Sequence, residues 1–291
     1  MVPQPPARPA SPAGLPDPGR CLVMGVVNVT PDSFSDGGDW FGTDAAIQHG
    51  LDLAAQGADI IDVGGESTRP GAQRISAEEE LRRVGPVIAA LVAEGLAVSV
   101  DTMRAPIVEH ALAAGARLVN DVSGGLADPA MPRLVGKAGV PYVVVHWRGH
   151  SHDMYRRAIY QDVVAEVRDE LRRRVDTVAA EGVDPSLIII DPGLGFAKRA
   201  EHNWALLTHL GQLGDDRPDP AQLFLGRDAL CAGPGRLASD IDDVGALPGQ
   251  VQAVLDGGVR PEPGTAVGER VRRHVDHAHH QAPPWIRETG R

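Results

Sequence analysis

The chain alternates short runs of apolar, β-branched residues with longer segments in which apolar positions recur at helical spacing. The short runs predict strands at residues 22–28, 60–63, 97–101, 118–121, 142–146 and 187–191. The longer segments predict helices at residues 44–56, 77–94, 105–114, 129–138, 163–181 and 200–213. This regular alternation of strand and helix predicts a parallel sheet covered by helices.

A polar residue lies at or near the carboxyl end of nearly every predicted strand. These residues are Asn28, Asp62, Asp101, Asn120, His146 and Asp191. A doubly wound sheet would bring together only the residues near its switch point, whereas a barrel brings all strand ends to one mouth. The pattern therefore favours an α/β barrel, although a complete (β/α)8 barrel has eight units and only six are legible here.

Composition divides the chain into three parts. Residues 1–19 are rich in Pro and Ala and contain no apolar signal segment, which predicts a disordered leader. Residues 20–213 carry the six barrel units. Residues 214–291 contain acidic and Pro- and Gly-rich stretches, one helix-like piece near residues 247–255 and no clear apolar strand. We expect this last part to be a divergent, poorly patterned tail.

Charge and cysteine content restrict the partners and the compartment. The formal net charge of −11 argues against nucleic acid or an anionic membrane as the main partner. No apolar run approaches the ~20 residues needed to cross a bilayer. Two cysteines, Cys21 and Cys231, are too few for a disulfide framework or a zinc site. These features indicate a protein of the reducing cytoplasm.

Two polar loops follow the first two predicted strands. The first loop, within residues 24–38, contains hydroxyl, carboxylate and aromatic side chains at Asp32, Ser33, Phe34 and Ser35. The second follows a Gly-Gly pair and contains Thr68, Arg69 and Pro70. Its hydroxyl and guanidinium donors suit a phosphate or a carboxylate.

Three further strand ends carry Asp101, Asn120 and Asp191. Two carboxylates and an amide facing one mouth can bind a flat heterocycle that bears amino and ring N–H donors, although each could instead cap a helix. His146 could be either a ligand-binding or a structural side chain. This inventory suits catalysis by positioning of a ring and a phosphate leaving group, with Mg2+ neutralising the developing charge.

The polar strings resemble the signature motifs of dihydropteroate synthase, in particular the actinobacterial form. The resemblance rests on residues 24–38, 57–72, 99–104, 119–125 and 191–198. It implies an α/β fold, a TIM (β/α)8 barrel, usually in a homodimer. It also implies a transferase that condenses p-aminobenzoate with 7,8-dihydropterin-6-ylmethyl pyrophosphate to give dihydropteroate and pyrophosphate in folate biosynthesis. Sulfonamides would compete for the p-aminobenzoate site.

The resemblance also implies roles for individual residues. Asp101, Asn120 and Asp191 would hold the pterin, and Asn28 would lie beside Mg2+ and the pyrophosphate. The first loop (Asp32, Ser33, Phe34 and Ser35) and the second loop (Thr68, Arg69 and Pro70) would close over the substrates. His146 is assigned to substrate binding as well.

The tail departs from the family pattern. The family's seventh strand ends in a Ser-Arg-Lys string and its eighth in Arg-Val-His, and neither string occurs after residue 213. Strands 7 and 8 are therefore expected to be degenerate or missing, which places catalytic competence in question. The alternatives are a non-catalytic pterin-binding relative, a defective product of a frameshift in the tail, or, with less support from the loop strings, the pterin domain of a methyltetrahydrofolate methyltransferase.

Overall fold

The computed structural model describes residues 11–18, 20–30, 38–67, 74–149, 154–213 and 222–223. Within these ranges one seven-stranded parallel sheet follows chain order from β1 to β7. Its strands are β1 (Met24–Asn28), β2 (Ile60–Gly64), β3 (Val98–Asp101), β4 (Leu118–Asp121), β5 (Tyr142–Val145), β6 (Ile188–Asp191) and β7 (Gln222–Leu223). Each strand pairs with its neighbour in sequence, which is the order of a TIM barrel. In a doubly wound sheet the order of the strands would instead reverse at a switch point.

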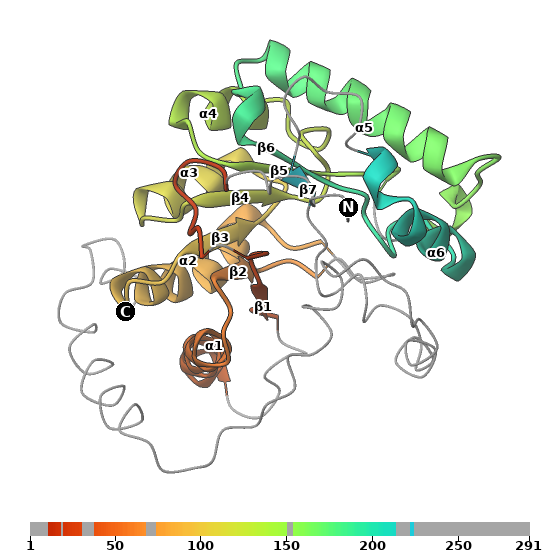
Figure 1. The fold of residues 1–291 in the computed structure, drawn as a ribbon. Coiled ribbons are helices and arrows are strands. Elements are labelled where there is room, and N and C mark those ends of the chain that lie inside the picture. Colours follow the sequence, from red (N-terminus) through yellow and green to blue (C-terminus); the bar gives the residue numbers. More distant parts are fainter. Residues whose placement is uncertain are drawn as a thin grey trace, which may run out of the picture.

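The helices cover the outer side of the curved sheet (Figure 1). They are α1 (Gly38–Ala55), α2 (Ala77–Ala93), α3 (Ala105–Ala113), α4 (Met131–Ala138), α5 (Val163–Ala180) and α6 (Ala200–Thr208), with short 3-10 turns η2 (Met154–Arg157), η3 (Pro185–Leu187) and η4 (Leu210–Leu213). Local capping starts some of them: Asp162 accepts the backbone N–H groups of Val164 and Ala165 at the start of α5. No helix in the described ranges is both long and apolar enough to span a membrane.

Side-chain alternation along the strands separates two apolar layers. Outward residues such as Val100 and Ile190 pack with Leu91 and Leu206 of the helices. Inward residues form a second cluster, made of Met24, Ile60, Leu118, Val143, Val145 and Ile189. Because side chains alternate with period two, polar residues nearer the carboxyl ends of these strands also face the barrel interior. They lie above the inward cluster, which forms an apolar floor.

The N-terminal segment reaches the apolar floor. Leu15 packs against the inward cluster, and its N–H donates to the carbonyl oxygen of Pro12. Within residues 11–18, one leucine therefore covers apolar surface at the bottom of the sheet. Residues 1–10 and 19 lie outside the described part of the chain.

Strand β7 lies in the segment for which the sequence predicts no clear strand. Gln222 pairs with Ile189 and Leu223 with Ile190, in parallel with β6. A two-residue strand offers no apolar run for a pattern to detect, so only tertiary pairing reveals it. Apart from β7, the predicted tail of residues 214–291 lies outside the described residues.

Candidate active site

The strand ends bring four of the predicted site residues to one edge of the sheet. Asp101 pairs in register with Asn120, and Gly64 pairs with both Asp101 and Asn28. Asp191 ends β6 and lies opposite Val145 of β5. Asn120 is 9% exposed and Asp191 is 7% exposed, so their polar groups lie in the barrel mouth and away from bulk solvent.

For the two predicted loops, the structure describes only the residues on either side. The side chains of the first loop, Asp32, Ser33, Phe34 and Ser35, lie outside the described residues. The same holds for Thr68, Arg69 and Pro70 of the second loop. Their predicted roles in substrate binding remain predictions.

Asp191 is held in place by the turn that follows it. Its Oδ1 accepts the N–H of Gly193 at 2.7 Å, and its carbonyl oxygen accepts the N–H of His146 at 2.8 Å. Gly193 has φ +64°, and a Cβ at this position would collide with the carbonyl oxygen of His146. The ends of β5 and β6 are thereby fixed against each other.

His146 and Lys198 form a buried polar pair beneath this turn. Lys198 Nζ lies 2.9 Å from His146 Nδ1 and also donates to the carbonyl oxygens of Gly193 and Phe196. Since the anionic carboxylate of Glu170 can only accept, the imidazole proton is on Nε2, 2.9 Å from Glu170, and Nδ1 accepts from Lys198. A substrate contact from either imidazole nitrogen would require one of these bonds to break. The geometry supports the structural interpretation of His146.

Burial controls the charges of this pair. It lowers the pKa of Lys198 to about 7, although the carboxylate of Asp191 opposes the shift. Burial, reinforced by the nearby Lys198 cation, also lowers the pKa of His146 to about 4. His146 is therefore neutral at physiological pH.

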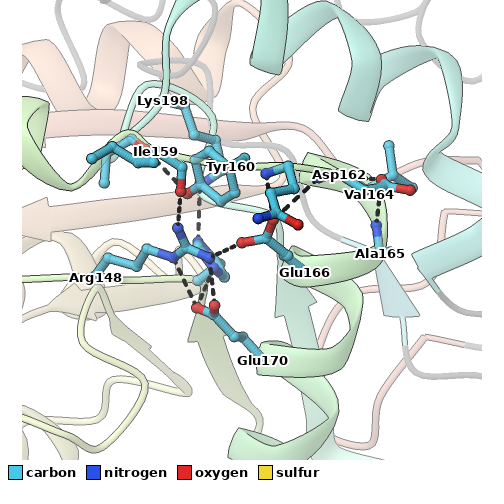
Figure 2. A network of polar contacts seen from close by, with 12 residues as sticks. Arg148, Ile159, Tyr160, Asp162, Val164, Ala165, Glu166, Glu170 and Lys198 are labelled. Atoms are coloured by element: carbon cyan, nitrogen blue, oxygen red, sulfur yellow. Dashed lines mark hydrogen bonds and ion pairs between the residues drawn. The ribbon is translucent and has the colours of Figure 1, made fainter.

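Arg148 connects the pair to helix α5 (Figure 2). Its Nη2 donates to Glu166 at 2.8 Å and to Glu170, while Nη1 donates to the carbonyl oxygen of Ile159. The guanidinium also lies over the ring of Tyr160, 3.9 Å from its centre, which is a cation–π contact. Although burial would raise the pKa of Glu170, its bonds from His146 and Arg148 hold that pKa at about 2. Glu170 is therefore an anion between two donors.

A second network lies beside the flanks of the second loop. Arg104 Nη2 donates to Glu66 at 2.6 Å and to the carbonyl oxygen of Ile75 at 2.7 Å, one on each side of the loop. Arg104 Nη1 pairs with Glu80, which is 1% exposed and also accepts the hydroxyl of Thr102. Both flanks of the loop are thus tied to the residues that follow Asp101.

The sequence alone predicts no role for several of these residues. Arg104 and Lys198 lie inside the motif strings, and Asp62 is one of the polar strand residues. Asp62 is 2% exposed and accepts the side-chain N–H of Asn120 at 2.8 Å. Spacing alone does not reveal that a carboxylate on β2 contacts an amide on β4. The two residues are neighbours only in three dimensions.

The predicted Mg2+ site rests on Asn28. Mg2+ prefers oxygen ligands, retains waters and is commonly held by one or two protein oxygens together with substrate phosphates. The half-buried amide of Asn28 at the barrel mouth suits such a shared site. In the described ranges no group of three or more His, Cys, Asp or Glu side chains could hold a metal ion.

Acid is expected to destabilise the protein through His146. The pKa of His146 falls from 6.5 to about 4 on folding, so between these values the unfolded chain binds a proton that the folded chain does not. The free energy of unfolding therefore decreases as the pH falls from 6.5 to 4, by about 3 kcal/mol from this group. Chemical denaturation at a series of pH values measures this slope.

The variant His146→Asn provides the comparison, because it removes the titrating group. We expect a shallower pH dependence of its unfolding free energy over the same range, whatever its absolute stability. Equal slopes in the two proteins would contradict the neutral, buried state of His146.

Comparison with known proteins identifies the family. A family model described as "Pterin binding enzyme" matches residues 24–227, which includes β7. The dihydropteroate synthase of Mycobacterium leprae is 57% identical over 192 residues, covering 66% of this chain and 68% of the relative. That of Synechocystis is 40% identical over 232 residues, covering 73% and 80%.

Solved structures agree with these matches. Dihydropteroate synthase of Xanthomonas albilineans with 4-aminobenzoic acid aligns at a TM-score of 0.67 and 42% identity, covering 82% of both chains. The same enzyme with 7,8-dihydropteroate aligns at 0.64 and 39%, again covering 82% of both. The strand order, the polar barrel mouth and these matches together show that the chain belongs to the dihydropteroate synthase family of pterin-binding enzymes.

Proposed function

We propose that the chain binds a dihydropterin pyrophosphate in its barrel mouth and joins it to p-aminobenzoate, forming dihydropteroate. The observation that carries this proposal is the convergence of Asp101, Asn120 and Asp191 at one edge of the sheet. Relatives of this chain have been solved with 4-aminobenzoic acid and with 7,8-dihydropteroate. The carboxylates would accept ring N–H and amino hydrogens of the pterin, which fixes the ring relative to the loops.

The reaction needs positioning more than acid–base chemistry. The bond between the exocyclic carbon and the pyrophosphate oxygen breaks, and pyrophosphate leaves with the electron pair. The neutral amine of p-aminobenzoate forms the new C–N bond and loses a proton. Mg2+ bound beside Asn28 would neutralise charge on the departing pyrophosphate. The protein's part is to hold the ring in line with the arylamine and to exclude water.

Lys198 does not replace the missing lysine of the family's seventh-strand motif. Its Nζ is buried and donates to the carbonyl oxygens of Gly193 and Phe196 beside His146. It therefore has three contacts inside the protein. The second candidate function, pterin binding without turnover, is favoured by this observation and by the absence of the Ser-Arg-Lys and Arg-Val-His strings.

The proposal includes three further expectations carried by the family resemblance and the composition. The first and second loops would close over the substrates, two copies would form a homodimer, and the protein would act in the cytoplasm. The relatives described above are named as dihydropteroate synthases, which favours the synthase over the methyltransferase alternative.

The decisive experiment measures pterin binding and turnover separately on the purified full chain. We expect 6-hydroxymethylpterin monophosphate to bind, and Asp101→Asn to raise its Kd roughly 10- to 100-fold, because one partner of a charge-assisted hydrogen bond is lost. Isothermal titration calorimetry gives the Kd, and chromatography of the products gives the rate of dihydropteroate formation.

Asp176→Asn, an exposed change on α5, is the matched control and should leave the Kd unchanged. Binding together with turnover supports the synthase, whereas binding without turnover supports the non-catalytic relative. Absence of pterin binding in the unmodified chain would exclude both functions.

Gly64→Ala tests the placement of Asp101. A Cβ at position 64 would lie 3.1 Å from Asp101 Oδ2, so the carboxylate must shift by a few tenths of an ångström. We expect the pterin Kd to rise about fivefold, since the hydrogen bond is weakened but not removed. Gly211→Ala, where a Cβ meets no atom within 4 Å, should change nothing. Equal affinities of the two variants would show that Asp101 does not contact the ring.

Removal of divalent cations tests the shared Mg2+ site. A chelator should weaken binding of the pterin pyrophosphate at least tenfold, because Mg2+ held beside Asn28 would neutralise charge on the phosphate oxygens. Binding of 6-hydroxymethylpterin, which has no phosphate, should be unaffected. Titration calorimetry with and without Mg2+ compares the two ligands, and an equal effect on both would contradict a site shared with pyrophosphate.

A further inference from the structure

Asp62 is a buried carboxylate inside the barrel to which the proposed mechanism gives no role. It lies in the middle of β2, in the same inward row as Ile60, and is 2% exposed. In register it pairs with Ser99 of β3, which is completely buried. A charged group at such a position requires a function or a partner that justifies its removal from water.

One partner of Asp62 is the side chain of Asn120. Its Nδ2 donates to Asp62 Oδ2 at 2.8 Å, across the intervening strand β3. A carboxylate can only accept hydrogen bonds, so the opposite amide orientation would place two acceptors face to face. Asp62 therefore selects one of the two orientations of the Asn120 amide.

This choice determines what Asn120 presents to a ligand. Its Oδ1 is buried and has no hydrogen-bond partner among the described residues. The hydroxyl of Ser99 is likewise buried and without a partner in that part of the chain. Buried polar atoms in native proteins are nearly always satisfied, so these two atoms indicate a polar ligand at the barrel interior.

We propose that Asp62 is a positioning residue, which holds Asn120 so that Oδ1 and the second Nδ2 hydrogen face the pterin as an acceptor and a donor. This inference rests on the proposed function, because the ligand is the pterin of the same site. A heterocycle with ring N–H groups and unprotonated ring nitrogens matches an amide held in one orientation. Without Asp62 the amide would populate two orientations, only one of which matches.

The test replaces Asp62 by its isosteric amide. In Asp62→Asn the side chain at position 62 can donate as well as accept, so Asn120 is no longer held in one orientation. We expect the Kd for 6-hydroxymethylpterin monophosphate to rise at least about twofold, because only one of two equally populated amide orientations would bind the ring. Titration calorimetry on the full chain measures the change.

Asp121→Asn is the matched control for loss of a buried carboxylate. Asp121 is completely buried on β4, but its partners are Ser123, Gly125 and Tyr142, of which Tyr142 packs in the outer layer. We expect this variant to lower the Tm and to leave the pterin Kd unchanged.

The double variant Asp62→Asn with Asn120→Asp separates stability from positioning. It restores a hydrogen bond between the two positions with donor and acceptor exchanged, so the Tm should return toward that of the unmodified protein. The Kd should remain high, because the group at position 120 then has no hydrogen to donate to the ring.

Three results would overturn the proposal in distinguishable ways. If Asp62→Asn lowers the Tm but binds the pterin as tightly as the unmodified chain, Asp62 is only structural. If the double variant regains full affinity, the orientation of the amide does not matter. If the unmodified chain fails to bind the probe, the proposed function fails, and the role of Asp62 in it fails as well.

Discussion

Parallel pairing of strands in chain order is the constraint on which the rest of this structure depends. It aligns the carboxyl ends of β3, β4 and β6 at one edge, while period-two alternation sends every second side chain inward. Toward the amino end of the strand this inward row is apolar, as at Ile60 and Leu118. Toward the carboxyl end it becomes polar, as at Asp62 and Asn120. A hydrophobic floor and a polar mouth therefore arise from the same strands, and the floor excludes water from beneath the site.

The polar mouth is stabilised from outside by two networks of buried charge. Around His146, the ammonium of Lys198 and the carboxylate of Glu170 engage the two ring nitrogens, and Arg148 extends the network to α5. Breaking such a buried pair by removing one partner usually destabilises a protein by several kcal/mol. This network contacts the backbone that follows Asp191, and the second ties both flanks of the second loop to Arg104, three residues after Asp101.

Much of this architecture could be predicted from the sequence. The six apolar runs, the helices between them and the polar strand ends lead to the barrel and to Asp101, Asn120 and Asp191, because alternation and strand-end chemistry are local properties. The bond between Asp62 and Asn120 and the environment of Lys198 could not be predicted, since their partners are 58 and 52 residues away in the chain. Strand β7 lies where the sequence predicts a degenerate seventh strand: its two residues carry too little pattern, and pairing with β6 defines it.

The sequence by itself determined the fold class, the family and the residue types at the barrel mouth, because periodicity and motif strings are written in the order of the chain. Only the tertiary structure decided which partners those residues contact. His146, expected to contact a substrate, has both ring nitrogens engaged by Lys198 and Glu170, and Asp62, to which no role had been assigned, orients the amide of Asn120. The physical reason is that a side chain's role depends on its charge, its burial and the partners that folding brings to it.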